Sequence, residues 1–231
     1  MTFTHAWNGN ADCRNCTFRS SALFSGLTEQ DFKFIHDSVQ QVTLNPGDVL
    51  YKEGDSGHHL FTIRSGLLKL VQYLPDGTQR IVRLMRSTDV LGLEMMVAQE
   101  YAHEAIVLQT TELCRYPKDV IRALSQSNPV LHQDLMARWQ KALTEADAWI
   151  TRLSTGQSKK RMANLLLRLA AGNDAAKCYL ISREDMGSIL SMTTETASRT
   201  ISEFKRQGLI DEIRHNYVTL DIPAVEAIAA S

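Results

Sequence analysis

The sequence has no large excess of charge of either sign, no long apolar segment and few cysteines. Its 231 residues include 25 Lys and Arg against 26 Asp and Glu, a formal net charge of −1, so total charge indicates neither a nucleic-acid partner nor a membrane surface. No apolar run approaches the roughly 20 residues that span a bilayer, and the N-terminus MTFTHAWNGNADC lacks the pattern of a signal peptide. These absences predict a cytoplasmic protein with no membrane partner.

The four cysteines are Cys13, Cys16, Cys114 and Cys178. In a chain without an export signal they favour metal binding or redox chemistry over a disulfide framework. Cys13 and Cys16 have C-x-x-C spacing, which lowers a thiol pKa in suitable surroundings, so a reversible disulfide between them is an alternative to a metal. Cys178 is interpreted as structural.

Short strands separated by turn residues are predicted between Val42 and Tyr116. The turn sequences NPGD, EGDSG, RSG and PDG supply glycines for positive φ and aspartates for local backbone bonds. Between them lie VLYKE, HLFTI, LLKLVQYL and RIVRLM, which partly alternate and are rich in branched and aromatic residues. Regular strands with regular turns predict a closed antiparallel β-roll or barrel.

A long helix is predicted from about Pro129 to Leu153. Six apolar residues in it follow the spacing 4, 3, 4, 3, 4, namely Leu135, Trp139, Ala142, Ala146, Trp149 and Leu153. This heptad seam fits a helix that pairs with a copy of itself, while packing on its own barrel is the alternative. Two tryptophans on one seam need a wide partner surface, which favours a homodimer.

The C-terminal part has the pattern helix, turn, helix, hairpin. A polar hinge, STGQSKK, precedes the helical stretch RMANLLLRLAA, and a short helix is predicted over Ser182 to Leu190. After the turn SMT comes a second helix, and LIDEIRHNYVTL then forms two short strands around His215 and Asn216. This order of elements predicts a winged helix-turn-helix.

The second helix of this motif carries the candidate base contacts. Thr193 is expected to cap it, and Glu195, Ser198 and Arg199 then share one face near its N-terminal end. Glutamate accepts from the cytosine amino group, arginine donates two bonds to guanine, and serine serves either role in the major groove. The alternative is a surface Glu–Arg pair worth a few tenths of a kcal/mol.

Local charge favours the DNA-binding interpretation. Residues 155–210 contain nine Lys or Arg against five acidic residues (9 − 5 = 4), whereas residues 1–154 contain fifteen against seventeen. Lys205 and Arg214 are expected to neutralise phosphates. Thr194 and His215 complete the predicted DNA-binding set.

These features resemble the cyclic-AMP receptor protein/fumarate-nitrate reduction regulator (CRP/FNR) superfamily of bacterial transcription factors over nearly the whole length. The segments that carry the resemblance are NPGDVLYKEGDSGHHLFTIRSGLLKL, SKKRMANLLLRLA and ETASR. ETASR is similar to the E-x-x-S-R form of the FNR branch, because Thr194 stands where the cyclic-AMP branch has arginine. The resemblance implies a palindromic operator of the TTGAT…ATCAA type, and RNA polymerase as a further partner. Ser191 occupies the usual glycine position of the turn, so slightly different backbone geometry is expected there.

The fold class predicted in this way is α+β, in four parts. Residues 1–28 form an N-terminal arm with the C-x-x-C motif, and residues 29–128 form a sensor roll that resembles a cyclic-nucleotide-binding domain. Residues 129–154 form the dimerisation helix, and residues 155–231 form the winged helix-turn-helix.

By the same resemblance, the effector pocket is degenerate. Its cassette positions are Gly92, Leu93, His103 and Glu104, where a cyclic-nucleotide site has Gly-Glu and then Arg-Ser or Arg-Thr. Leucine cannot accept from a ribose hydroxyl, and a glutamate repels a phosphate. Cyclic AMP is therefore not expected, and the cavity is left to a different ligand.

Part of an iron–sulfur ligand set is also present by resemblance. Cys13, Cys16 and Cys114 are similar to cysteines of the oxygen-sensing FNR branch, in which thiolates hold the cluster, commonly four of them. Where that pattern has its third N-terminal cysteine, this chain has Ala22. Alanine has no donor atom, so the cluster is disfavoured and no cofactor is assigned.

The predicted function is a homodimeric, sequence-specific transcription regulator, not an enzyme, that responds to a redox, gas or small-molecule signal. A cupin-like metalloenzyme would need inward-facing histidines two residues apart, whereas the adjacent His58 and His59 point to opposite faces and are interpreted as solvated turn residues. A thiol oxidoreductase would place Cys13 and Cys16 in a βαβ fold. Neither alternative explains the helix-turn-helix.

Overall fold

The computed structural model describes residues 2–5, 27–28, 38–171, 177–214 and 216–231. The chain forms two compact units. The first consists of Met1–Gly77 and Val82–Leu143, and the second consists of Thr78–Ile81 and Thr144–Ser231. Among the described residues, no helix has the length and apolar character needed to cross a membrane.

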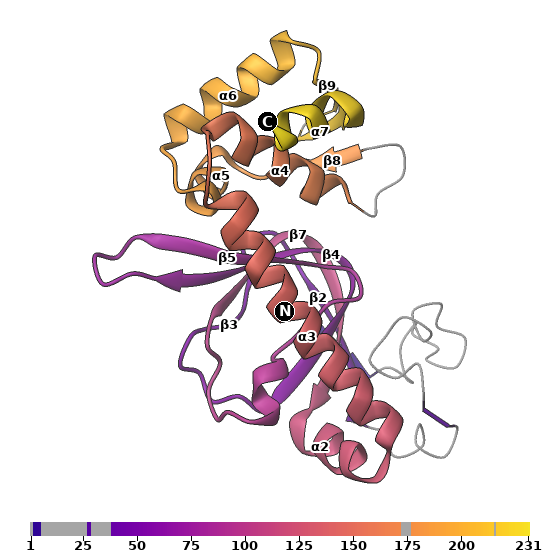
Figure 1. Cartoon of the computed structure of the whole chain (residues 1–231). Helices are drawn as coiled ribbons and strands as arrows, with labels where there is room; N and C mark the ends of the chain where they lie inside the picture. The colour runs from indigo at the N-terminus through magenta and orange to yellow at the C-terminus, as the bar shows by residue number, and fades with distance from the viewer. Residues whose placement is uncertain (1, 6–26, 29–37, 172–176, 215) are drawn as a thin grey trace. The chain divides into compact units, whose positions relative to one another are not determined.

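An antiparallel sheet is the framework of the first unit (Figure 1). Its strands within the described residues are β1 (Thr2–His5), β2 (Gln40–Leu44), β3 (Val49–Tyr51), β4 (His59–Tyr73), β5 (Gln79–Arg86), β6 (Val90–Leu91) and β7 (Glu104–Pro117). The order is β1-β2-β7-β4-β5, with β3 paired to β7 and β6 to β4. The long strands β4 and β7 pair antiparallel from His59↔Pro117 to Val71↔Glu104. The predicted antiparallel N-terminal sheet is confirmed.

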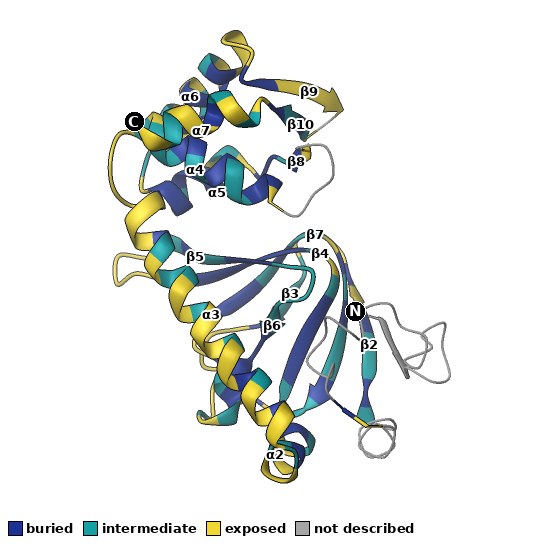
Figure 2. Cartoon of the chain, turned by 45° about the vertical axis from the view of Figure 1, so that its right-hand side comes forward, coloured by how far each residue is buried: buried dark blue, intermediate teal, exposed yellow. Residues whose placement is uncertain are grey.

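Burial alternates with a period of two in the short strand β2 but is nearly continuous in the long strand β4. In β2, Val42 and Leu44 are buried while Thr43 between them is exposed, as expected when successive side chains point to opposite faces. The long strand β4 is buried over most of its length, and Figure 2 shows the dark segments along β4 and β7. This extended burial creates the core of the first unit.

Two helices close the first unit. The four residues Leu93–Met96 form the 3-10 helix η2, and α2 spans Lys118–Ser127. Helix α2 was not predicted from the sequence, although its Ile121 and Leu124 belong to the roll core. Its ten residues follow directly on β7, whose last residue, Pro117, is also the N-cap residue of the helix.

The long helix α3 spans Pro129–Leu153, the bounds that the sequence predicts. Asn128 precedes it, and the Asn128 side-chain oxygen accepts from the backbone N–H groups of Val130 and Leu131 at 3.0 and 3.1 Å. These bonds satisfy two of the four unpaired N–H groups at the start of a helix.

The second unit contains the predicted helix-turn-helix with a small sheet. Its helices are α4 (Ser158–Ala170), α5 (Arg183–Leu190), α6 (Thr194–Arg206) and α7 (Ile222–Ala230), and its strands are β8 (Lys177–Tyr179), β9 (Ile210–Arg214) and β10 (Tyr217–Leu220). The sheet order is β8-β10-β9. The hairpin was predicted, but β8 and α7 were not.

Asn216 explains the tight connection between β9 and β10. Its φ of 61° lies in the left-handed region, which asparagine tolerates better than most residues because its side chain bonds locally.

The three residues of β8 are too few to show an alternating pattern in the sequence, although Cys178 in this strand is fully buried opposite Val218. This placement agrees with a structural role for Cys178.

Candidate nucleic-acid interface

Helix α6 presents one polar face and one buried face. Its buried residues are Ala197, Thr200, Ile201 and Phe204. Ion-pair partners at its N-terminal end are largely solvent-exposed, with side-chain exposures of 82% for Glu195 and 73% for Arg199. The apolar stripe therefore fixes the helix in its unit and turns Glu195 and Arg199 outward, while Ser198, the third predicted base contact, is half-buried.

The beginning of α6 is capped as the sequence predicts. Thr193 is the N-cap, and its hydroxyl accepts from the backbone N–H of Thr196 at 3.2 Å. This bond fixes where the helix begins and hence which residues share a face. Arg199 Nη2 donates to Glu195 Oε1 at 2.9 Å. Because the pair is so exposed, it is worth only a few tenths of a kcal/mol and can be exchanged for bonds to a ligand.

The turn between α5 and α6 depends on two positions. A Cβ on Gly187 would lie 2.6 Å from the backbone oxygen of Met192, so only glycine allows the turn to approach the helix this closely. Ser191 ends α5 with φ 52° and ψ 50°, in the left-handed region. Serine here adopts a conformation that glycine adopts freely, at some cost in strain.

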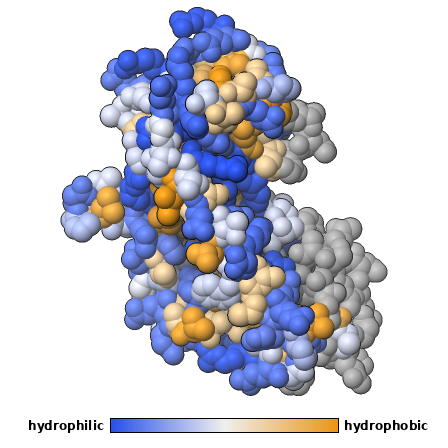
Figure 3. Space-filling view, in the orientation of Figure 1, coloured by the Kyte–Doolittle hydropathy of each residue, from blue (hydrophilic) through white to orange (hydrophobic). Residues whose placement is uncertain are grey.

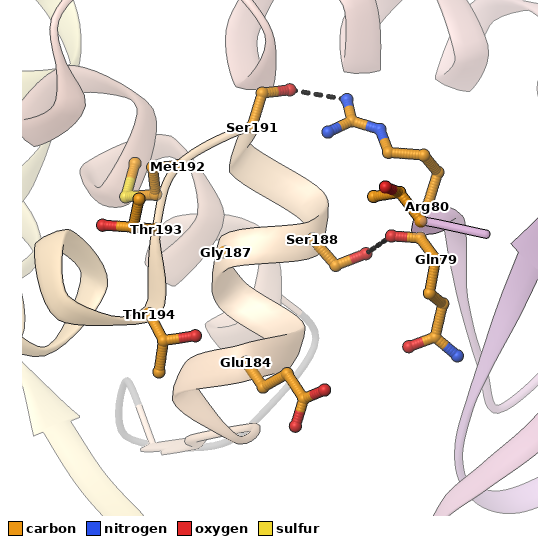
Figure 4. A pocket seen from close by; sticks show the side chains of 10 residues that line it. Gln79, Arg80, Glu184, Gly187, Ser188, Ser191, Met192, Thr193 and Thr194 are labelled. Atoms are coloured by element: carbon orange, nitrogen blue, oxygen red, sulfur yellow. Dashed lines mark hydrogen bonds between the residues drawn. The ribbon is translucent and has the colours of Figure 1, made fainter. Parts of the chain in front are cut away.

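Both serines near this turn are hydrogen-bonded within the second unit (Figure 4). Ser188 Oγ donates to the carbonyl oxygen of Gln79 at 2.8 Å and accepts from the backbone N–H of Ile81 at 3.0 Å. Arg80 Nη2 donates to Ser191 Oγ at 2.5 Å. The segment Thr78–Ile81 therefore belongs to the hydrogen-bond network that supports the turn, a feature with no sequence signal because about 110 residues separate the partners.

Basic side chains lie at the far end of α6 and on the hairpin. Lys205 Nζ pairs with Glu212 Oε2 at 2.5 Å, and the Arg214 guanidinium lies 4.4 Å from the centroid of the Tyr217 ring. Both cations are exposed. His215, also predicted to contact DNA, lies outside the described residues.

The charge surplus of residues 155–210 does not extend to the C-terminus. Residues 211–231 contain one arginine, Arg214, against four acidic residues (1 − 4 = −3), so residues 155–231 carry a surplus of only one. Placement of individual cations around α6, rather than the charge of the whole unit, therefore favours phosphate contacts.

The residues of the degenerate effector pocket lie in the first unit and are largely buried. Leu93 is 7% exposed and Glu104 is 9% exposed, and the Tyr73 hydroxyl donates to Glu104 Oε2 at 2.7 Å. Burial lowers the pKa of His103 from its ordinary value, with opposing and supporting contributions from nearby Glu94 and Arg83. An anionic phosphate at Glu104 would be repelled by this buried carboxylate.

Of the three candidate cluster ligands, only Cys114 lies within the described residues. It is half-buried on β7, where it pairs with Gln41 of β2 and Thr62 of β4. Cys13, Cys16 and Ala22 fall outside the described part of the chain, which by itself contains no group of three or more His, Cys, Asp or Glu side chains able to hold a metal. The described residues thus contain one of the three candidate cluster ligands, which is not enough to establish a cluster site.

The six residues of the predicted seam on α3 fall into two groups. Leu135, Trp149 and Leu153 are 2%, 8% and 2% exposed within a single chain. Leu135 packs in the core of the roll, which is the alternative that the sequence left open, whereas Trp149 and Leu153 belong to the second unit. Trp139 is 36% exposed, and Ala142 and Ala146 are half-buried.

A second apolar stripe runs beside the predicted seam. Met136, Leu143 and Ile150 are 50%, 58% and 61% exposed, and with Trp139 and Ala146 they follow the spacing 3, 4, 3, 4. Figure 2 shows the largely exposed surface of α3, and Figure 3 shows apolar side chains on the face along which it runs. Sequence alone did not distinguish the two stripes, because both have a heptad period.

Comparisons with known proteins match both units. The cyclic nucleotide-binding domain model matches residues 41–128, and the Crp-like helix-turn-helix domain model matches residues 160–228. The transcriptional activator protein anr of Pseudomonas aeruginosa is 28% identical over 207 residues, which cover 87% of this chain and 85% of that protein. The nitrogen fixation regulation protein FixK of Bradyrhizobium diazoefficiens is 27% identical over 225 residues, with coverage of 95% and 94%. The structure of FixK2 from Bradyrhizobium japonicum has the same fold, with a TM-score of 0.77 and 20% identity over 84% of this chain and 98% of that chain.

A nucleotide-binding-type roll, a long helix and a helix-turn-helix with exposed polar residues on α6 define a DNA-binding transcription regulator, not an enzyme. The chain belongs to the CRP/FNR superfamily, in its FNR-like branch. The comparisons give no support to the cupin-like or thiol oxidoreductase alternatives. The adjacent histidines also differ from each other, because His58 is exposed as predicted whereas His59 is half-buried and contacts Arg115.

Proposed function

We propose that the protein binds a two-fold symmetric operator of the FNR type as a homodimer and that Glu195, Ser198 and Arg199 distinguish its bases. The observation that carries the proposal is the exposed Glu195–Arg199 pair at the capped end of α6. A cation and a carboxylate on adjacent turns match the donor and acceptor pattern of neighbouring G·C and C·G edges in the major groove.

Neighbouring residues complete this surface. Thr193 and Thr194 are exposed at the start of α6, where the helix dipole and unpaired N–H groups favour a phosphate. Lys205 and Arg214 supply positive charge for phosphates on either side. His215 remains a proposed contact on the basis of its sequence position alone.

The partner surface for a second copy is the exposed stripe on α3. In a single chain, four apolar side chains of this stripe are exposed: Met136, Trp139, Leu143 and Ile150. Their heptad spacing allows the side chains of two parallel copies of the helix to pack between one another. We therefore assign the dimer contact to this stripe together with the accessible residues of the predicted seam. The division into an arm at 1–28, a sensor roll at 29–128, a dimerisation helix at 129–154 and a DNA-binding domain at 155–231 is part of the same proposal.

The first unit is proposed to act as a sensor for a signal other than cyclic AMP. The buried Leu93 takes the place where a cyclic nucleotide needs an acceptor for its ribose, and the buried Glu104 would stand beside its phosphate and repel it. An iron–sulfur cluster stays disfavoured by Ala22, and RNA polymerase stays the expected partner of the DNA-bound dimer. A signal that binds one arrangement of the dimer better shifts the population toward that arrangement.

A binding selection on randomised duplexes at one fixed salt concentration tests the proposal. The parent protein should enrich a two-fold symmetric site. Arg199→Ala should lose about 1–3 kcal/mol per half-site and relax the preference at one base pair, because a bidentate guanine contact is removed. Glu195→Ala should relax the preference at a different pair, since a cytosine amino group loses its acceptor.

Lys205→Ala is the matched control for these substitutions. It removes a cation outside the predicted base-contacting face, so it should weaken all duplexes alike and reduce the dependence of affinity on salt. The Glu195–Arg199 pair is only a solvated helix face if the parent protein enriches no symmetric site. The same conclusion follows if both α6 variants keep the base preference of the parent.

A further inference from the structure

Two ion pairs lie on opposite flanks of helix α6. Lys159 Nζ, in the first turn of α4, pairs with Glu203 Oε1 at 2.6 Å, and Lys205 Nζ pairs with Glu212 Oε2 at 2.5 Å. At 3.6 residues per turn, Glu203 lies about 80° around the helix from Glu195, and Lys205 lies about 80° from it in the other direction. The exposed face of α6 is therefore bordered on each side by a lysine that a carboxylate holds.

These flanks are where a DNA duplex would bring its phosphates. The major groove is about 12 Å wide, and a helix with its side chains is about 10–12 Å across, so a helix in the groove has one phosphate backbone close to each flank. Lysines on the flanks suit these phosphates, whereas carboxylates on the flanks oppose them. This step rests on the proposed function, in which α6 is the element that contacts the bases.

The pair on the α4 side is accessible and fully formed. The side chains of Lys159 and Glu203 are 50% and 22% exposed, and Gln207 Nε2 donates to the same Oε1 of Glu203 at 3.1 Å. The hydrogen bond from Lys159 lowers the pKa of Glu203, with the charges of Lys159 and Arg206 acting in the same direction. Glu203 is therefore ionised at neutral pH.

Stability of the fold does not account for this carboxylate. The residues that fix α6 in its unit are apolar or small, and Glu203 is not among the buried ones. An accessible ion pair contributes little to folding, and its lysine can exchange one anion for another. After such an exchange, Glu203 would stay within a screening length of about 8 Å of the phosphate and repel it.

We propose that Glu203 limits the affinity of the protein for DNA by holding Lys159 in the free protein, so that a backbone phosphate has to displace this carboxylate when the duplex binds. The role differs from that of Glu195 and Arg199, because it concerns the backbone and not the bases. It lowers the sequence-independent part of the affinity, so a larger share of operator binding comes from base contacts. The surplus of only one positive charge in residues 155–231 agrees with this balance of cations and carboxylates.

Fluorescence anisotropy with labelled duplexes tests the proposal on the full-length protein. One duplex carries the TTGAT…ATCAA palindrome and the other has the same bases in scrambled order, each measured between about 50 and 200 mM salt. Glu203→Gln keeps the shape of the side chain and removes its charge. It should raise the affinity of the dimer for both duplexes by about tenfold, or about threefold for each protomer.

The salt dependence and a second substitution identify the lysine. In Glu203→Gln, the logarithm of affinity should fall more steeply with the logarithm of salt, by about 1–2 units, because Lys159 neutralises a further phosphate in each protomer. Lys159→Met should weaken binding to both duplexes. In the Lys159→Met background, Glu203→Gln should raise the affinity by only about twofold or less, since no lysine remains to be released.

Glu226→Gln is the matched control, because it makes the same change of charge at an exposed position of α7 in the same unit. Its affinity for both duplexes should stay within about twofold of the parent. An equal rise in Glu226→Gln would show that net charge alone sets the affinity and would refute a specific role of Glu203.

The remaining outcomes separate this inference from the proposed function. A parent protein that binds neither duplex would refute both. A parent that binds the palindrome while Glu203→Gln leaves the affinity unchanged would refute only the role of Glu203. An equal gain from Glu203→Gln with and without Lys159 would refute the exchange of partners, and a gain confined to the palindrome would refute a contact with the backbone.

Discussion

Replacing the exposed apolar residues of α3 by glutamate should dissociate the dimer without unfolding the chain. Trp139→Glu and Leu143→Glu each place a carboxylate on the stripe that a single chain leaves accessible, where the side chains are 36% and 58% exposed. In the dimer, each carboxylate would be buried without a partner, which is strongly unfavourable. In the monomer, it would remain in contact with water.

The exposed areas set the size of the effect. A tryptophan side chain offers about 250 Å², so the accessible third of Trp139 buries roughly 90 Å² on pairing and stabilises the dimer by about 2 kcal/mol in each protomer. Both copies are lost in the variant, which amounts to about 4 kcal/mol, or roughly a thousandfold in the dissociation constant. Burial of two carboxylates increases this further. Leu143 contributes about 1 kcal/mol in each protomer, and its variant should weaken the dimer at least tenfold.

Sedimentation velocity over a dilution series from about 100 μM to 0.1 μM covers this range of dissociation constants. Ala137→Glu is the matched control, because Ala137 is exposed and lies about 200° around the helix from Trp139. Leu135→Glu should behave differently, since Leu135 is 2% exposed in its own chain and a charge there should unfold the roll.

Unchanged dimer dissociation constants in both Trp139→Glu and Leu143→Glu would refute the assigned stripe. A folded Leu135→Glu protein that is monomeric would instead place the contact on the seam predicted from sequence. Whichever stripe forms the dimer contact, loss of the dimer should weaken operator binding, because each protomer then binds a single half-site.

Three further outcomes are expected. Cyclic AMP should not stabilise the protein, because Leu93 and Glu104 replace the ribose and phosphate partners. A ligand that binds would add about 2.7 kcal/mol to the free energy of unfolding at a hundredfold excess over its dissociation constant. A saturable rise in melting temperature with cyclic AMP would contradict this prediction. Protein prepared without oxygen should contain little iron and sulfide because of Ala22, and a stoichiometric cluster that Cys13→Ser abolishes would show an overlooked ligand. The pKa of His59 is lowered to about 4 from 6.5, so between these pH values the unfolded chain binds one more proton than the folded chain and the free energy of unfolding falls as pH drops. His59→Gln should reduce this fall by about 1 kcal/mol after allowance for solvent screening, as measured by denaturation at pH 4 and 7. An unchanged pH profile would exclude this contribution of His59.

Local patterns predicted the helix-turn-helix well because each of its signals acts over a few residues. Thr193 caps α6 through a partner only three residues away, and the Glu195–Arg199 pair spans one turn of the helix. The apolar residues Ile201 and Phe204 then decide which face is buried. Short-range hydrogen bonding and helical periodicity are sufficient for this outcome.

Local sequence patterns did not predict the elements whose existence depends on packing. Helix α7 has the start signals of an Asp221 N-cap and a proline in its first turn, but its nine residues have apolar side chains on more than one side and show no clear helical stripe. Strand β8 contains three residues and is held by its pairing with β10, about 40 residues further along the chain. His59 was interpreted as solvated, because its contact with Arg115 spans 56 residues and has no sequence signal.

The sequence by itself determined the order of the elements that it predicted and the capped helix α6, because these follow from residue chemistry at fixed short spacings. It also determined that α3 has an apolar seam. Only the tertiary structure decided which stripe of that helix is covered by its own chain, since Leu135 and Met136 are adjacent in sequence but 2% and 50% exposed. The ion pair of Lys159 with Glu203 likewise required the fold, because 44 residues separate the two partners. Burial and proximity are properties of the whole folded chain, and a periodic pattern specifies a face without specifying what covers it.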